Sequence, residues 1–147
     1  MIRVWRISNY ADLTGKGGLR VSGRWHSKGR PVIYAAEHPA GAMTELLAHI
    51  DPADMPDNFQ LIEIEIDMAA TVPSVYPPRL TGTWTSKPRL TRALGDAWLK
   101  EASSLALRVP SALVPDAWNV LLNPVHADAR HMKIVKVQKA LLDARLK

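Results

Sequence analysis

The sequence contains no cysteine, a single phenylalanine and no long apolar run. The absence of cysteine excludes a disulfide scaffold, a thiolate zinc site and a cysteine nucleophile, and it agrees with a reducing compartment. The longest apolar runs, such as residues 32–36, are far too short to cross a bilayer. The opening residues have neither an apolar signal core nor a small-residue cleavage site. We therefore expect a cytoplasmic protein that does not enter a membrane.

Several catalytic and nucleotide-binding motifs are also missing. The chain has no phosphate-binding Gly-x-x-x-x-Gly-Lys-Ser/Thr loop, no Gly-x-Gly-x-x-Gly, no Gly-x-Ser-x-Gly and no His-Glu-x-x-His. Glu45 and His49 stand one helical turn apart, but two ligands without a third are weak evidence for a metal site. We expect neither a metal nor a permanently bound cofactor.

The size and charge of the chain leave its partner class open. Its 147 residues fit one domain, the net charge is +5 and the pI is about 9.7. A basic chain attracts polyanions, so a nucleic acid, an anionic cofactor and an acidic protein partner are all compatible with it.

Hydrophobic periodicity predicts an α+β fold in one domain. Residues 61–67 alternate strictly, which indicates a strand with one solvated face that carries Glu63, Glu65 and Asp67. Residues 14–30 hold five glycines and are expected to form a surface loop. The other expected elements are strands at 2–7, 31–36, 106–109 and 133–137, and helices at 39–50 and 88–103.

Side-chain patterns add detail to these elements. Thr85 or Ser86 is a plausible cap for the helix at 88–103. The prolines at 73, 77 and 78 indicate an extended loop. The apolar stripes are Ala42, Met43, Leu46, Leu47 and Ile50 in the first helix, and Leu90, Leu94, Ala97 and Trp98 in the second.

Arg24, Tyr34 and Glu45 form the densest group of residues that could carry chemistry. A loop, a strand and a helix follow one another there, and such a unit can bring the three side chains together. Glu45 borders a buried stripe, so it is either a solvated boundary residue or a carboxylate held in a cleft with Arg24 as its partner. Tyr34 is either a core residue or a ring that stacks on a planar ligand.

A second segment contains Ser111, Asn119 and Asn123 in apolar surroundings. The serine hydroxyl needs a partner, which a turn or a helix cap can supply. The two asparagines are more often turn formers than ligands.

The order of these segments resembles the RES domain, a family that takes its name from an Arg, a Glu and a Ser. The resemblance covers nearly the whole chain. It lies in Val4-Trp5-Arg6-Ile7, Gly23-Arg24-Trp25, Lys28-Gly29, residues 31–36, Pro39 through Glu45, Val109-Pro110-Ser111, Val114-Pro115 and residues 119–124.

This resemblance implies a toxin of a type II toxin–antitoxin pair, with a single-domain fold like that of the ADP-ribosylating bacterial toxins, in which small mixed or antiparallel sheets have flanking helices. Its partner would be an Xre-type helix-turn-helix antitoxin in a hetero-oligomer, and its substrate would be NAD, cleaved by hydrolysis, phosphorolysis or ADP-ribosyl transfer. The implied catalytic residues are Arg24, Tyr34 and Glu45. The implied substrate-binding residues are Arg6, Ser111 and Asn119.

Two alternatives remain at this point. The positive charge near the C-terminus is compatible with a nucleic-acid-directed toxin that cleaves RNA, or with a basic binding module, although no nucleic-acid-binding signature is present. A non-enzymatic partner protein is the third possibility. It predicts that Arg24→Ala and Glu45→Ala leave the cellular effect intact.

Overall fold

The computed structural model describes residues 1–55, 57–67, 72–75 and 82–146. These residues build a six-stranded sheet in the order β4-β5-β2-β1-β3-β6, and every neighbouring pair of strands is antiparallel. The strands are β1 (Ile2–Ser8), β2 (Ile33–Ala36), β3 (Gln60–Ile66), β4 (Ala106–Pro110), β5 (Trp118–Leu122) and β6 (Met132–Lys139).

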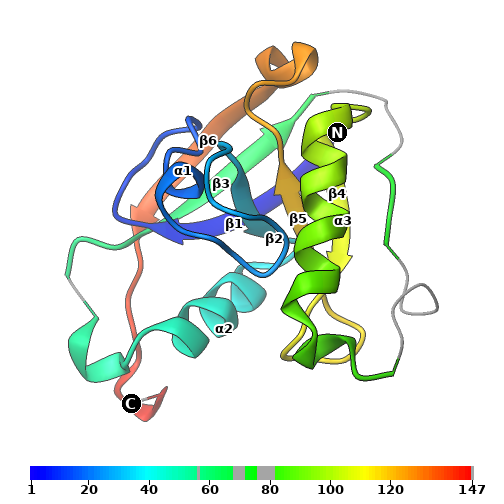
Figure 1. The fold of residues 1–147 in the computed structure, drawn as a ribbon. Helices are drawn as coiled ribbons and strands as arrows, with labels where there is room; N and C mark the ends of the chain where they lie inside the picture. The colour runs from blue at the N-terminus through cyan, green and yellow to red at the C-terminus, as the bar shows by residue number, and fades with distance from the viewer. Residues whose placement is uncertain (56, 68–71, 76–81, 147) are drawn as a thin grey trace.

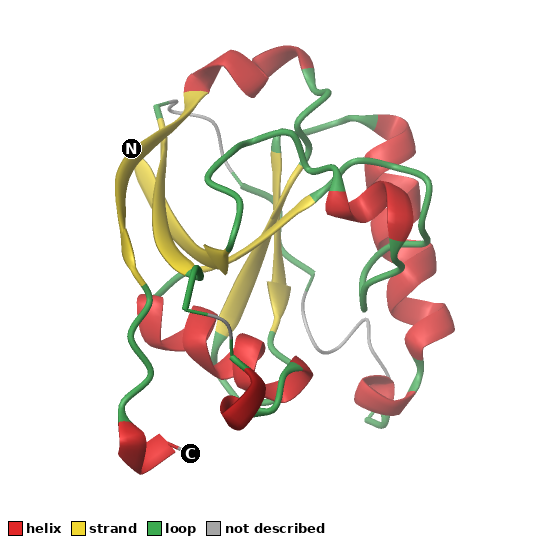
Figure 2. Ribbon diagram, turned by 90° about the vertical axis from the view of Figure 1, so that its left-hand side faces the viewer, coloured by secondary structure: helices red, strands yellow, loops and turns green. Residues whose placement is uncertain are grey.

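Two helices of more than two turns accompany the sheet. The longer, α3, stands beside the β4–β5 side of the sheet, and α2 lies below the strands at one end (Figures 1 and 2). No helix among the described residues is long and apolar enough to cross a membrane. The helices are α1 (Gly17–Arg20), α2 (Pro39–His49) and α3 (Pro88–Glu101), with 3-10 turns η1 (Pro52–Asp54), η3 (Trp84–Ser86), η4 (Ala127–His131) and η5 (Ala144–Leu146).

Each face of the sheet carries its own hydrophobic core, because successive strand residues point to opposite faces. In β2, Ile33 and Ala35 belong to one core, with apolar residues of β1, β3 and β5. Tyr34 packs against the other core, which α3 covers with Trp98 and Leu99. Tyr34 therefore lies on the face of the sheet that α3 covers.

The predicted α+β class is confirmed, with differences that tertiary pairing explains. The sequence patterns did not predict β5. Asn119, expected in a turn, lies in this strand. In place of the expected small sheets, the described strands form one antiparallel sheet. The face of β3 that carries Glu65 is not fully solvated: the side chain of Glu65 is 7% exposed and pairs with Arg3 and Lys133 on the flanking strands.

Smaller corrections concern helix ends and loops. The N-cap of α3 is Lys87, without a side-chain cap bond, so neither Thr85 nor Ser86 caps it. Ala97 is exposed, and of the apolar stripe expected in α2 only Ala42 is fully buried. Pro73 lies beside β4, where its carbonyl accepts the amide of Arg108. The expected loop at prolines 77 and 78 lies outside the described residues.

Candidate active site

The carboxylate of Glu45 is held by two side chains that are distant in sequence. Its Oε1 accepts hydrogen bonds from Ser111 Oγ at 3.0 Å and from Asn119 Nδ2 at 2.8 Å. No described residue bonds the other carboxylate oxygen, Oε2. The result is an oriented carboxylate with one oxygen committed to the protein and one available to a ligand.

Strand pairing creates this cluster. β5 lies between β4 and β2, so Asn119 is registered with both Val109 and Ala36. Ser111 follows β4 directly, and its Oγ also accepts the amides of Leu113 and Val114, which fixes the hydroxyl in a turn. α2 begins just after β2, and this brings Glu45 to the same end of the sheet.

Arg24 lies in a segment that α3 holds along its length. Arg92 Nε donates to the carbonyl of Gly23 at 2.8 Å, and the hydroxyl of Thr91 donates to the carbonyl of Arg24. Asp96 accepts the amide of Ser27 at 2.8 Å. The guanidinium of Arg24 is partly exposed and donates to the carbonyl of Thr85 at 2.8 Å.

One glycine allows this close contact. A Cβ at Gly95 would lie 1.5 Å from the carbonyl oxygen of Trp25, a distance that no side chain can occupy. Glycine inside a helix costs about 1 kcal/mol relative to alanine. Glycine is required at position 95 because the backbone of the Arg24 segment lies too close to α3 for any side chain.

Tyr34 supports the Arg24 segment from the sheet. Its hydroxyl accepts the amide of Trp25 at 3.2 Å and lies 2.6 Å from Nδ1 of the buried His26. Burial raises the pKa of Tyr34 to about 12, and the hydrogen bond from Trp25 opposes that rise. The hydroxyl is thus used within the protein. Stacking of the ring on nicotinamide stays a prediction.

The sheet links the Arg24 segment to the Glu45 cluster. Tyr34 and Ala36 are two residues apart on β2, so they share a face, and Ala36 is paired with Asn119. Tyr34, which touches the Arg24 segment, and Asn119, which touches Glu45, therefore lie on one face of the sheet. Five of the six site residues predicted from the sequence lie on or beside this face of the sheet: Arg24, Tyr34, Glu45, Ser111 and Asn119.

Arg6 occupies a different environment. It is paired with Ile62, on the face of β1 opposite to that of Trp5, which is paired with Ala36. Its guanidinium is half-buried and makes no hydrogen bond or ion pair with any described residue. Burial lowers the pKa of Arg6, and the charge of Asp12 opposes this. A half-buried cation whose guanidinium is bonded by no described residue favours an anionic ligand, even with the charge of Asp12 nearby.

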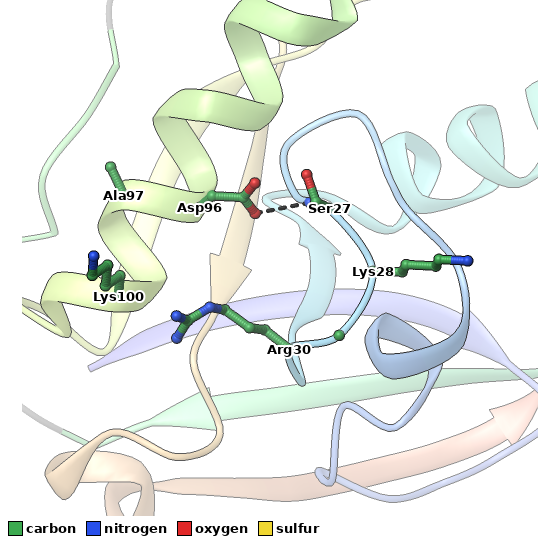
Figure 3. Close-up of a pocket in the computed structure, with 7 residues that line it drawn as sticks. Ser27, Lys28, Arg30, Asp96, Ala97 and Lys100 are labelled. Carbon is green, nitrogen blue, oxygen red and sulfur yellow. Dashed lines mark hydrogen bonds between the residues drawn. The ribbon is translucent and has the colours of Figure 1, made fainter.

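A basic hollow of about 330 Å³ lies between the loop at residues 27–30 and α3. In Figure 3, Arg30 and Lys100 extend on the same side of it, whereas Lys28 points away from α3. Asp96 is occupied by the amide of Ser27. The hollow is distinct from the Glu45 cluster, since none of its lining residues belongs to that cluster.

The remaining chemistry-bearing groups have structural uses. Lys133, Lys136 and Lys139 lie on β6, an edge of the sheet. Lysines commonly protect such edges from pairing with other chains, so their charge does not require a nucleic acid. Within the described ranges no group of three or more His, Asp or Glu side chains could hold a metal ion.

Sequence reasoning missed His26, Thr91 and Gly95. Their contacts reach across the fold, for example 67 positions from Thr91 to Arg24, and no local pattern reports such contacts. The one available signal was the glycine inside the pattern of a helix.

Comparison with known proteins identifies the family. The model of the RES domain matches residues 3–143. The chain is 50% identical over 145 residues to the Toxin Res of Pseudomonas putida, covering 97% of this chain and 98% of that protein. It is 35% identical over 152 residues to the Prs ADP-ribosylating toxin of Sphingobium sp., covering 97% and 94%.

A solved structure has the same fold. The crystal structure of the M. tuberculosis MbcT–MbcA toxin–antitoxin complex matches with a TM-score of 0.76 at 16% sequence identity, covering 95% of this chain and 84% of that chain. The family model and the sequence matches establish that the chain belongs to the RES-domain family of toxins.

Proposed function

We propose that this protein is the toxin of a type II toxin–antitoxin pair and that it cleaves the nicotinamide–ribose bond of NAD. The observation that carries the proposal is the Glu45 carboxylate, whose Oε1 is fixed by Ser111 and Asn119 while no described residue bonds Oε2. The 35% identical relative named as an ADP-ribosylating toxin supports the same chemistry.

The reaction needs a fixed carboxylate more than a strong acid. When the bond between ribose C1′ and the nicotinamide nitrogen breaks, both electrons leave with the nicotinamide, which departs as a neutral molecule. The ribose carries the positive charge in an oxocarbenium-like state, and an oxygen of the acceptor then bonds to C1′. Where that oxygen carries a proton, as in water or a hydroxyl group, the proton is released to solvent. A preoriented carboxylate stabilises that charge without reorganising during the reaction.

Each site residue has a role in this scheme. Glu45 Oε2 bonds a ribose hydroxyl or faces C1′, while Ser111 and Asn119 hold the carboxylate. The guanidinium of Arg24 binds the pyrophosphate, since its planar fork matches phosphate oxygens. The ring of Tyr34 contacts nicotinamide and its hydroxyl fixes the Arg24 segment. Arg6 lies on the opposite face of the sheet and has no hydrogen bond or ion pair to a described residue; its role as a second cation for the dinucleotide requires the substrate to pass the end of β1.

We further propose that an Xre-type helix-turn-helix antitoxin binds the protein and inhibits it by covering the site. The net charge of +5 favours an acidic segment of that antitoxin as the inhibiting element. An antitoxin complex in which Glu45 stays open to solvent would contradict this mode of inhibition.

The central test follows nicotinamide release from NAD by the purified full chain, with and without phosphate. We expect release that Glu45→Gln reduces at least hundredfold, while Glu101→Gln, the same change at an exposed position on α3, leaves it intact. Dependence on phosphate separates phosphorolysis from hydrolysis, and labelling of an added protein reveals transfer. Wild-type turnover by Glu45→Gln would overturn the proposed mechanism.

A further inference from the structure

We propose that His26 is a positioning residue for this site: its neutral ring, bonded to Tyr34, holds the Arg24 segment in place, and protonation of the ring releases that segment. This inference rests on the proposed function, because the binding of NAD by Arg24 is what the ring would control.

Four hydrogen bonds around the ring pair fit one protonation state. The amide of Gly23 donates to His26 Nδ1 at 3.2 Å, so Nδ1 is an acceptor. The hydroxyl of Tyr34, 2.6 Å away, then donates to the same nitrogen, and its oxygen accepts the amide of Trp25. Nε2 carries the hydrogen and donates to the carbonyl of Gly18 at 3.1 Å. The neutral Nε2–H form satisfies all four, and the amide of Gly23 also donates to the backbone carbonyl of His26 at 3.1 Å.

Protonation would place a second hydrogen on Nδ1. That hydrogen would point at the hydroxyl of Tyr34, whose own hydrogen would then lose Nδ1 as its acceptor, while the amide of Gly23 keeps the backbone carbonyl of His26. His26 is 2% exposed, so water cannot take the place of the lost acceptor. A donor left without an acceptor inside a protein is costly, and the segment is therefore expected to move.

The fit around the ring transmits such a movement to the backbone. A Cβ at Gly23 would lie 2.3 Å from the hydroxyl oxygen of Tyr34 and 3.1 Å from His26 Nδ1. Gly23 directly precedes Arg24, and its carbonyl is bonded to Arg92. A shift of the ring pair thus changes the position of the residue that carries the guanidinium.

The charged side chains nearest to the ring of His26 come from its own segment and from α3. Arg24 belongs to the same segment, and α3 contributes Arg92 and Asp96, whose side chains bond the backbone at Gly23 and Ser27. β2 contributes Tyr34, and α1 contributes the carbonyl of Gly18. No carboxylate in the described part of the chain bonds the ring of His26.

The first test is the pH profile of kcat/KM for NAD in the wild type, His26→Asn and His126→Asn. For the wild type we expect the KM to rise at least tenfold on the acid side, because Arg24 is displaced. Asparagine at position 26 offers an oxygen near the place of Nδ1 and does not titrate, so that acid rise of the KM is expected to be absent. His126 also accepts a backbone amide through Nδ1, from Asp128, and its variant is the matched control with the wild-type profile.

The second test needs no turnover. Nitrogen-15 NMR of the full chain reports which nitrogen of His26 is protonated, and the amide signals of Arg24 and Trp25 report the segment. We expect a protonated Nε2 and an accepting Nδ1 at neutral pH, with both amides shifting as the ring titrates. Absence of NAD cleavage alone would contradict the proposed function. A doubly protonated ring at neutral pH, amides indifferent to its titration, or an unchanged acid rise in His26→Asn would overturn the role of His26.

Discussion

The side-chain amide of Asn119 donates to Glu45 Oε1 at 2.8 Å across 74 positions of sequence. An amide nitrogen only donates and a carboxylate oxygen only accepts, so this contact fixes the rotation of both groups. Because Ser111 bonds the same oxygen, the open Oε2 has a defined direction.

Replacing Asn119 with aspartate should uncouple the carboxylate from its support. Two acceptors would then face each other, and a hydrogen bond to a charged group is worth about 1.5–3 kcal/mol. We expect kcat for NAD cleavage to fall about tenfold to hundredfold. Asn58→Asp, the same change at an exposed position, is the control. Equal kcat values for the two variants would contradict the orienting role of Asn119.

Gly95→Ala should destabilise the protein although alanine is the better helix former. The added Cβ would lie 1.5 Å from the carbonyl oxygen of Trp25, so α3 and the Arg24 segment must separate. Overpacking of this kind costs about 1–3 kcal/mol. Gly17→Ala, where no atom lies within 4 Å of the added Cβ, should leave the melting temperature nearly unchanged. A melting temperature of Gly95→Ala at or above that of the wild type would refute this packing.

Tyr34 should make stability fall at alkaline pH. Its folded-state pKa of about 12 lies above the usual 10.0, so the folded protein holds the phenolic proton more tightly than the unfolded chain does. The resulting stabilisation is complete below pH 10 and is lost as the pH rises toward 12. Between pH 9 and 11 the loss is about 1 kcal/mol. Denaturant unfolding at several pH values measures this loss in the wild type and in Tyr34→Phe, which has no phenol group at position 34. Equal pH dependence of the free energy of unfolding in the two proteins would contradict the prediction.

We expect Arg6 to lower the free energy of unfolding and to contribute to the binding of NAD. Arg6→Met removes a half-buried cation without a partner among the described residues, so the free energy of unfolding should rise by about 1 kcal/mol. The KM for NAD should rise about tenfold or more, since a charge-assisted hydrogen bond is lost. Arg3→Met is the contrasting variant: it removes a partner of the buried Glu65 and should lower stability without changing the KM. An unchanged KM in Arg6→Met would remove Arg6 from the site.

The sequence by itself determined the local elements and the family. The apolar spacing in residues 39–50 and 88–103 and the alternation in 61–67 predicted α2, α3 and β3 to within two residues at each end. These patterns are local, because an amphipathic helix or strand needs only a repeating set of apolar side chains. The order of the short motifs predicted the RES family, which the family model confirms over residues 3–143.

Only the tertiary structure decided which residues touch. The placement of β5 between β4 and β2 put Asn119 in a strand beside Glu45, and the contact of α3 with the Arg24 segment gave Gly95 and Thr91 their roles. Strand order and helix packing are set by the summed burial of two cores, and a single hydrogen bond between distant positions leaves no periodic trace in the chain. Residue types therefore indicated the chemistry, and the register of the sheet set its geometry.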